Sequence, residues 1–492
     1  MGTTVKKHEI DMLHGSIWNK LPLFALPVAA TAILEQLFHA SDVAIVGNFT
    51  GDARTVAVAA VGANGPIIGL IVNLFIGIAL GANAIGCRDD NAVKRAVHTA
   101  IVFAVCGGAA VALLGQLIAS PLLSILNVPE DVFPYALLYL RIYLLGMPVI
   151  LLYNFEAAIF RSIGDTKVPL AALAISGVLN VLLNLFFVIV LHMTVNGVAI
   201  ATVAANAVSA ALLYVRLTRT DKCVRVERKA LRIDGASLKR ILSIGLPAGV
   251  QSAVFSFANI VIQSAINTLG TVAIAASSAA FNVEILAYDV LNSFSQACTT
   301  FVGQNYGAGQ IKRCKKTMQL SFLEGAIATF VSVVVLLLSA RSLLAIFNSD
   351  PEVIAIGYIR LATILPAYVF CLIYEILSGY LRGFGISLVP AILTLFGVCG
   401  VRIVWINTVF PLHHTFRSIM LVYPISLATT AVLIFIALLV YRPSRRFAAA
   451  HSESDRLQAE RERVQGELVK LTNNTLAAQA RNELGALQNQ LR

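Results

Sequence analysis

The chain has 492 residues, of which 58% are hydrophobic and only 13% are charged, and its formal net charge is +11. Water-soluble domains carry about 25% charged residues, so this composition excludes a soluble protein and indicates a membrane protein. The basic residues gather at predicted helix ends and in a few loops, as membrane orientation requires. The positive charge therefore does not indicate nucleic-acid binding.

Twelve apolar stretches follow one another along the chain. A helix needs roughly 20 apolar residues to cross the hydrocarbon core of a bilayer. Residues 1–19 precede the first stretch, are polar, and show no cleavable signal peptide, so we expect a cytoplasmic N-terminal segment. The predicted spans are 21–45, 56–84, 97–119, 134–159, 169–191, 196–216, 241–268, 272–302, 319–340, 354–380, 389–410 and 418–441.

The connections between the predicted spans differ in basic charge. Even-numbered connections carry clusters such as Lys94-Arg95 and Lys312-Arg313, whereas odd-numbered connections contain few Lys or Arg residues. Cytoplasmic loops carry the excess of Lys and Arg, so we expect a multi-pass protein of the plasma membrane with both termini in the cytoplasm. The basic run at 217–240 is interpreted as an orientation signal that contacts lipid headgroups.

The second half of the chain repeats the first at a spacing of roughly 220 residues. FRSIGDTKVP at 160–169 returns as LRGFGISLVP at 381–390. Each half has an even number of spans, so the halves share one orientation and are related by a pseudo-two-fold axis along the membrane normal. The predicted fold is an all-α membrane protein with twelve transmembrane helices in two parallel six-helix lobes. Its predicted parts are an N-terminal segment 1–19, an N-lobe 20–216, a cytoplasmic linker 217–240, a C-lobe 241–442 and a tail 443–492.

The tail differs from the rest of the chain. It is rich in Ala, Gln, Glu, Arg and Leu, with apolar residues at Leu457, Val464, Leu468 and Leu471. This spacing fits a cytoplasmic helix or coiled coil. We expect an accessory helix, with self-association as its candidate role, rather than a part of the transport machinery.

No motif indicates an enzyme, a metal centre or a cofactor. HExxH and GxSxG do not occur, and the seven cysteines form no CxxC pair and no Cys/His cluster. All seven fall in predicted spans or cytoplasmic connections, so we expect no disulfide. The expected partners are small-molecule substrates and membrane lipids.

Polar residues inside the spans are the candidates for function, because a charged side chain costs about 2.5–3.5 kcal/mol at a helix centre. Asp42 lies late in the first span, and its short side chain cannot reach the membrane surface. Asn180 and Asn184 lie one turn apart in the fifth span, and Thr202 lies in the sixth. Together these groups suit binding of a hard cation or relay of a proton. The same residue types also form ordinary hydrogen bonds between helices, so a functional and a purely structural interpretation both stay open.

Other residues inside the spans are weaker candidates. Arg141, Arg360 and Glu324 are interpreted as interface residues with snorkelling side chains, and Arg141, Arg360 and Arg402 also offer partners for acids within the spans. Acids outnumber bases in the spans, which favours a cationic or neutral substrate. The secondary candidates for cation coupling or substrate binding are Glu35, Gln36, Glu284, Asp289 and Glu375.

Several segments together resemble the multidrug and toxic compound extrusion (MATE) family over residues 15–442. They are Pro27 with Asp42-xxx-Val46-Gly47, FRSIGDTKVP, FVGQNYGAGQIKR at 301–313, RIVWI at 402–406 and VYPIS at 422–426. The resemblance implies a V-shaped pair of six-helix lobes. It also implies export of organic, often cationic, compounds in exchange for inward H⁺ or Na⁺.

The resemblance carries a cation-coupling and substrate site over to Asp42, Asn180, Asn184 and Thr202, with Na⁺ as a candidate ligand of Asp42, Asn180 and Thr202. DinF-like members of the family have an Asp where this chain has Asn184, so one carboxylate is present instead of two. We expect neutralisation of Asp42 to bend the first span at a hinge, Pro27. No cofactor is expected beyond the coupling ion.

The predicted function is that of a secondary active antiporter. Its substrates are expected to be organic compounds of cationic or amphipathic character, exchanged for H⁺ or Na⁺. The alternative is a lipid-linked precursor flippase, or a dedicated metabolite exporter, of the same superfamily. A flippase needs a more cationic cleft for its pyrophosphate headgroup than the acids in these spans suggest.

Overall fold

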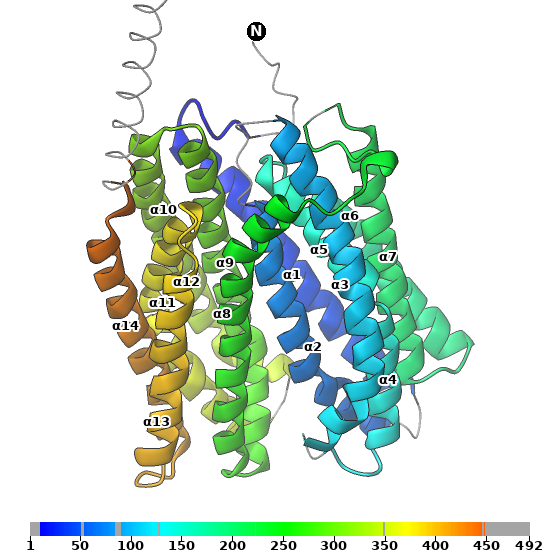
Figure 1. The fold of residues 1–492 in the computed structure, drawn as a ribbon. Coiled ribbons are helices and arrows are strands. Elements are labelled where there is room, and N and C mark those ends of the chain that lie inside the picture. Colours follow the sequence, from blue (N-terminus) through cyan, green and yellow to red (C-terminus); the bar gives the residue numbers. More distant parts are fainter. Residues whose placement is uncertain are drawn as a thin grey trace, which may run out of the picture. The chain divides into compact units, whose positions relative to one another are not determined.

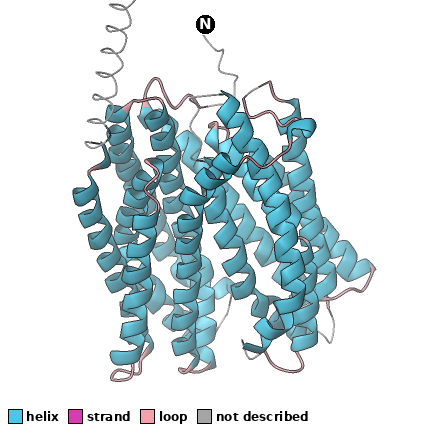
Figure 2. Ribbon diagram, in the orientation of Figure 1, coloured by secondary structure: helices cyan, strands magenta, loops and turns pink. Residues whose placement is uncertain are grey.

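The computed structural model describes residues 10–50, 54–83, 90–125, 128–221, 223–347, 350–444 and 447, and nearly all of them lie in helices (Figures 1 and 2). Residues Met1–Val440 form one compact unit, and Tyr441–Arg492 form a second. The first unit contains every predicted span apart from the last residue of span twelve. The predicted tail lies almost wholly outside the described residues, so its helical character stays a prediction.

The first half of the chain supplies six membrane-crossing elements. Helices α4 and α5 are bent by 51° at Gly146 and together make one span. Pro148 stands in the first turn of α5, where its missing N–H and fixed φ suit a new helix start. The elements are α1 Ile17–Phe49, α2 Arg54–Asn83, α3 Asp90–Ile125, α4 Phe133–Leu145, α5 Met147–Ser162, α6 Lys167–Leu185 with the π-helix η2 Phe186–Val190, and α7 Val195–Arg219.

The second half of the chain also supplies six membrane-crossing elements, which follow the short 3-10 helix η3. The elements are η3 Arg228–Ala230, α8 Gly235–Asn267, α9 Thr271–Gly307, α10 Ile311–Phe347, α11 Pro351–Gly383, α12 Leu388–Thr394 with the π-helix η4 Leu395–Gly400 and α13 Val401–Thr408, and α14 Phe416–Tyr441. Eleven stretches of helix in the described residues are long and apolar enough to cross a membrane, and α4 with α5 makes a twelfth. The prediction of an all-α protein with twelve spans is confirmed.

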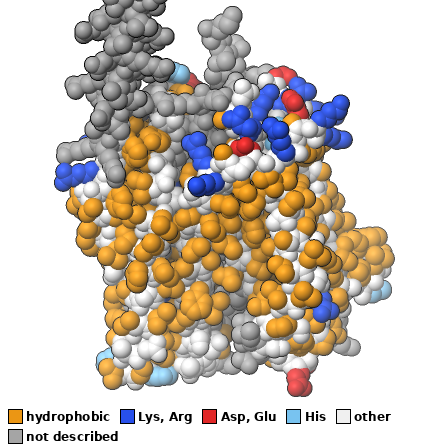
Figure 3. Space-filling model, in the orientation of Figure 1, with side chains coloured by type: hydrophobic (Ala, Val, Ile, Leu, Met, Phe, Trp, Pro, Cys, Tyr) orange, Lys and Arg blue, Asp and Glu red, His pale blue; other side chains and the backbone are white. Residues whose placement is uncertain are grey.

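Charge and hydrophobicity separate along the helices. Hydrophobic side chains cover the flank of the helices in Figure 3, while Lys and Arg gather at one end. We call this end, which includes the start of α3, the connection 220–234 and the start of α10, the basic end. The connection is docked rather than loose, because Glu227 N donates to His98 Nε2 at 3.0 Å and Asp234 N donates to Thr99 Oγ1 at 3.0 Å.

Helix α8 begins just after this docked connection. Asp234 caps it by accepting from Ser237 N at 2.9 Å and from Ser237 Oγ at 2.6 Å. These hydrogen bonds hold the pKa of the Asp234 carboxyl below its ordinary value. The helix-free part of the predicted linker is therefore shorter than 217–240, because α7 continues to Arg219 and a capped turn starts α8 early.

The two halves meet through α2 against α8 and α1 against α9. The helix backbones come so close that a Cβ at Gly77 would collide with the backbone of Gly249, and one at Gly245 with the carbonyl of Ile78. Glycine is therefore needed at these crossings. All four residues lie near the basic end of α2 and α8.

Other contacts between the halves lie near the same end. Phe24 of α1 and Phe301 of α9 meet edge to face, with ring centroids 5.9 Å apart. Gln304 Nε2 of α9 donates to the carbonyl of Ser162, at the end of α5, at 2.6 Å. The halves are thus joined where the basic loops are.

Candidate functional site

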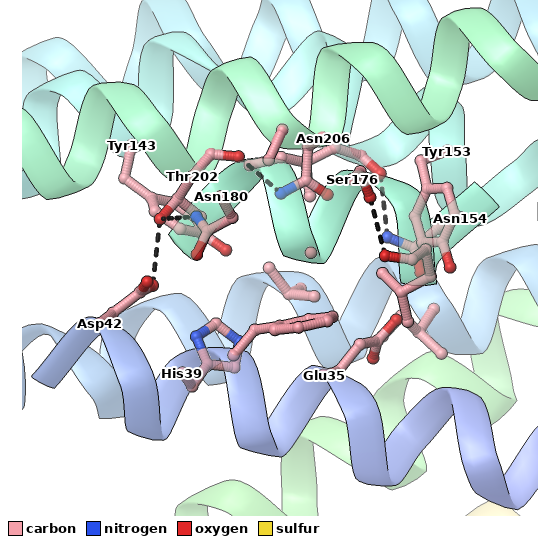
Figure 4. A pocket seen from close by; sticks show the side chains of 17 residues that line it. Glu35, His39, Asp42, Tyr143, Tyr153, Asn154, Ser176, Asn180, Thr202 and Asn206 are labelled. Carbon is pink, nitrogen blue, oxygen red and sulfur yellow. Dashed lines mark hydrogen bonds between the residues drawn. The ribbon is translucent and has the colours of Figure 1, made fainter. Parts of the chain in front are cut away.

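The first half of the chain forms a partly open cavity of about 90 Å³ between α1, α2, α4, α5, α6 and α7 (Figure 4). This volume holds several water molecules, since one needs about 10–15 Å³. It is smaller than the roughly 300–1,000 Å³ of pockets for drug-sized ligands. The cavity therefore suits an ion or water rather than an organic substrate. Its polar lining includes Glu35, His39, Asp42, Asn154, Ser176, Asn180, Thr202 and Asn206.

The four primary candidates form one hydrogen-bonded network at one end of this cavity. Asn184 Nδ2 donates to Asp42 Oδ1 at 2.5 Å, and Thr202 Oγ1 donates to Asp42 Oδ2 at 3.1 Å. Asn184 Nδ2 also donates to Asn180 Oδ1 at 3.1 Å, and Asn180 Nδ2 donates to Thr202 Oγ1 at 3.3 Å. All four side chains are buried, with Asp42 only 3% exposed.

Helical geometry explains why these residues meet. Asn180 and Asn184 are four residues apart on α6 and so lie on one face, and α6 packs against both α1 and α7. Thr202 has a second acceptor, because its hydroxyl also lies 3.0 Å from the carbonyl of Val198. One hydroxyl hydrogen serves one acceptor well at a time, so Thr202 can turn away from Asp42 without losing a partner.

The network has spare acceptors and no fixed positive charge. Asp42 has no ion-pair partner among the described residues, and its two hydrogen-bond donors are neutral. Asn184 Oδ1 is buried and lacks a hydrogen-bond partner among those residues. An uncompensated carboxylate in such a place is strongly unfavourable. A proton or a hard cation bound by Asp42 would neutralise it, and carboxylate, amide and hydroxyl oxygens are suitable ligands.

The secondary candidates of the second half do not line this cavity and are mostly paired. Arg360 Nε donates to Glu284 Oε2 at 2.8 Å, and Arg382 Nη2 lies 3.4 Å from Glu375 Oε2. These buried acids already have a positive partner and so differ from Asp42. Asp289 is in neither pair, and its Oδ2 is buried without a hydrogen-bond partner among the described residues.

The prediction that Arg360 and Glu324 are interface residues with snorkelling side chains is wrong. Arg360 is buried, because it packs between Glu284 and the ring of Tyr423, whose centroid is 5.4 Å away. Glu324 is also buried and does not reach the surface, because neighbouring helices cover α10 on that side. Arg141 is exposed, as expected of an interface residue.

The sequence analysis missed His39, which lines the cavity between two acids that it named. Glu35 and His39 face the cavity with Asp42, whereas Gln36 does not line it. The spacing of 35, 39 and 42 matches one face of a helix, and this signal was available in the sequence. Pro27, the predicted hinge, lies inside the unbroken helix α1, where Thr31 Oγ1 donates to its carbonyl at 2.8 Å.

Comparison with known proteins adds independent information. A family model described as MatE matches residues 27–186 and, a second time, residues 247–406. The chain is 26% identical over 438 residues to "Probable multidrug resistance protein YoeA" of Bacillus subtilis (strain 168), covering 85% of this chain and 93% of that one. It is 26% identical over 317 residues to "FAD transporter" of Shewanella oneidensis, covering 62% and 70%.

Solved structures support the fold. One titled "Outward-facing conformation of a multidrug resistance MATE family transporter of the MOP superfamily" superposes with a TM-score of 0.81. The sequence identity is 20%, and the match covers 92% of this chain and 100% of that one. The double match of the family model agrees with the internal repeat seen in the sequence.

Proposed function

Because the chain belongs to the MatE family of multidrug and toxic compound extrusion transporters, we propose that it is a secondary active antiporter. It exports organic compounds of cationic or amphipathic character in exchange for inward movement of H⁺ or Na⁺. The observation that carries this proposal is Asp42, a buried carboxylate with only neutral partners among the described residues.

Coupling follows from the change of charge at Asp42. When a proton or Na⁺ binds, the carboxylate no longer needs both of its donors, and Thr202 can turn to the carbonyl of Val198. Helix α1 is then free to bend at Pro27, where the backbone lacks one helical hydrogen bond. Because α1 packs against both α6 and α9, this bend changes helix contacts in both halves of the transporter.

The gradient of the coupling ion supplies the driving force. For a neutral substrate, one positive charge that moves inward contributes about 2.3 kcal/mol per 100 mV, which corresponds to a concentration ratio of about fifty-fold. For a monovalent cation such as ethidium, the outward charge cancels this contribution, and the concentration gradient of the ion drives the exchange. If the basic end is cytoplasmic, the contacts of Gly77 and Phe24 close the transporter on that side. The described arrangement then faces outward, where the coupling ion enters.

A second candidate function is export of an anionic metabolite or flipping of a lipid-linked precursor. Arg402 supports it, because this guanidinium is 2% exposed and, among the described residues, bonds only to neutral groups, Asn259 at 2.8 Å and Ser426 at 3.3 Å. Its positive charge suits a carboxylate or phosphate. FAD, the substrate in the name of the Shewanella oneidensis relative, contains phosphate groups.

The test uses purified protein in liposomes under separately imposed H⁺ and Na⁺ gradients. Ethidium serves as the organic cation and FAD as the anionic alternative. We expect one gradient to drive ethidium transport and neither to drive FAD transport. Transport of FAD without transport of ethidium would favour the second candidate.

Asp42→Asn tests the residue that carries the proposal. This variant keeps the shape of the side chain but cannot change its charge, so we expect gradient-driven transport to fall to the level of empty liposomes. Asp131→Asn, the same change at an exposed acid, is the matched control and should leave transport unchanged. Undiminished transport by Asp42→Asn would remove Asp42 from the coupling mechanism.

A further inference from the structure

Helix α1 presents three titratable side chains to one cavity. Glu35, His39 and Asp42 all line it, and Figure 4 shows them in a row along α1, opposite the polar side chains of α5, α6 and α7. Their spacing of four and three residues places them on one face of the helix. Asp42 is explained by the network with Asn184 and Thr202, but that network leaves Glu35 and His39 without a role.

The surroundings of these side chains differ along the row. Among the described residues, neither Glu35 nor His39 has a hydrogen-bond partner, and no charged group acts on His39. Titratable groups of α4, α5 and α9 face the row. Tyr139 and Tyr143 of α4 lie beside Asp42. The groups beside Glu35 are Tyr143 of α4, Tyr153 and Arg161 of α5, and Asp289 of α9. Positive charge is thus found only at the Glu35 end, where Arg161 lies one residue before the end of α5.

Water can connect the three groups. The cavity volume of about 90 Å³ exceeds the need of one water several-fold, and His39 is exposed to water-sized space although it lies within a span. Four residues of helix rise about 6 Å and three residues about 4.5 Å. One water with hydrogen bonds of about 2.8 Å on either side spans about 5.6 Å, so each gap is of the length that a single water can bridge.

We propose that the coupling ion is a proton and that His39 and Glu35 pass it from Asp42 toward the basic end. This inference rests on the proposed antiport and names its ion. A proton leaves the Asp42 carboxyl for one ring nitrogen of His39 through water, and the other ring nitrogen releases a proton through water to the Glu35 carboxylate. Asp42 ends ionised, His39 ends neutral and Glu35 ends protonated, so one proton has moved and the net charge of the three groups is unchanged.

Histidine makes this row suited to protons rather than Na⁺. Imidazole accepts and donates a proton near neutral pH, whereas alkali and alkaline-earth cations prefer oxygen ligands. Helix α1 starts at the basic end, so Glu35 lies nearer to that end than Asp42 does. Arg161, in the last turn of α5, lies toward the same end. The path therefore leads from the Asp42 network to the side that the positive-inside rule assigns to the cytoplasm.

The test separates movement of protons from movement of substrate. Glu35→Gln and His39→Gln remove titration and keep a polar side chain, and Asp131→Asn, at an exposed acid outside the cavity lining, is the control. In liposomes we measure ethidium transport driven by a pH gradient and ethidium exchange at equal pH, which needs no net proton transfer. We expect both variants to slow gradient-driven transport by roughly 100-fold, the lower end of what a positioned proton-transfer group contributes, with exchange unchanged.

Rescue adds a readout that a structural role would not move. His39→Glu restores a titratable group at the middle of the row, so gradient-driven transport should return with its pH profile shifted to lower pH, toward the range where a carboxyl titrates. The variants are compared only at equal amounts of reconstituted protein. Gradient-driven transport that is unchanged in both Gln variants, or exchange that falls in parallel with it, would overturn the relay.

Two further outcomes distinguish this inference from the proposed function. Transport by the unmodified chain that responds to Na⁺ but not to H⁺ would overturn the relay and leave antiport standing. Transport that responds to neither gradient would overturn the proposed antiport itself.

Discussion

Three buried acids of this chain, Asp42, Glu284 and Glu375, are stabilised in two different ways. Glu284 and Glu375 lie next to arginines, at 2.8 Å and 3.4 Å, whereas Asp42 is held by an amide and a hydroxyl. An ion pair keeps both members charged without help from solution. Asp42 has no such partner among the described residues and needs a mobile ion to neutralise it. This dependence on a mobile ion is the property that a coupling site requires.

Arg360 provides a test of this distinction. It bonds to Glu284 and, through Nη1, to Ser277 at 2.7 Å. Arg360→Met should lower the free energy of unfolding by about 3–5 kcal/mol, because it leaves a buried carboxylate without a positive partner. The double variant with Glu284→Gln should recover much of this loss. Denaturant unfolding of the purified protein measures both, and equal stability of the two variants would contradict the pairing.

At the scale of elements, α1 connects the site to the rest of the molecule. It carries Asp42, packs against α6 on one side and against α9 on the other, and contains Pro27 between its two ends. The most extensive interface between the halves is α2 against α8, where glycines let the backbones touch, and α3 also contacts α8. Movement of α1 and separation of α2 from α8 are thus two events that a change of access must combine.

Gly77 tests the second event. Gly77→Ala introduces a Cβ that meets the backbone of Gly249, whereas Gly69→Ala on the same helix meets nothing within 4 Å. Gly77→Ala should push the halves apart at the basic end and impair transport, and Gly69→Ala should not. Labelling of a cysteine introduced at Gln304, which bonds across the halves, measures the opening from that side. Equal labelling in both variants would contradict the close crossing.

At the scale of the whole molecule, the two halves share a fold but not a charge distribution. Asp42 follows Pro27 by the same interval at which Ile262 follows Pro247, so the second half has a buried aliphatic side chain in the place of the proposed coupling acid. It holds a guanidinium instead, since Arg402 lies 4.4 Å from the ring centroid of Tyr423. A fixed positive charge of this kind disfavours a second cation, so we expect coupling in the first half alone.

Orientation is also a property of the whole molecule, and it stays a prediction. Cysteines introduced at Asp131 and Asp350, which lie at the end opposite the basic one, should react with a membrane-impermeant reagent added outside intact cells. Cysteines at Lys229 and Lys315 should react only after the membrane is permeabilised. The expected site at Asp52 falls outside the described residues. External labelling at Lys229 would reverse the orientation.

The tail makes a separate prediction. Deletion of residues 451–492 should leave transport unchanged, because the family model ends at residue 406 and the first compact unit at Val440. We propose that the tail mediates self-association, so the truncated protein should elute as a smaller species in size-exclusion chromatography. Loss of transport at normal membrane abundance would assign the tail a regulatory role.

Much of the architecture follows from local properties of the sequence. A span is an apolar run of sufficient length, so the number of spans and the repeat were predicted correctly without any contact being known. Asn180 and Asn184 were placed on one face by their spacing alone, and the same argument applied to α1 would have found His39.

Which charges are paired was decided only by the tertiary structure. Glu284 and Arg360 are 76 positions apart, and Asp42 and Thr202 are 160 apart, so no local pattern links them. Burial of a side chain depends on what the neighbouring helices place over it, which is why Arg360 and Glu324 were wrongly assigned to the membrane interface. The sequence by itself determined the spans, their repeat and the candidate acids. Helix packing decided which of those acids have a positive partner in the described part of the chain and which, Asp42 among them, do not.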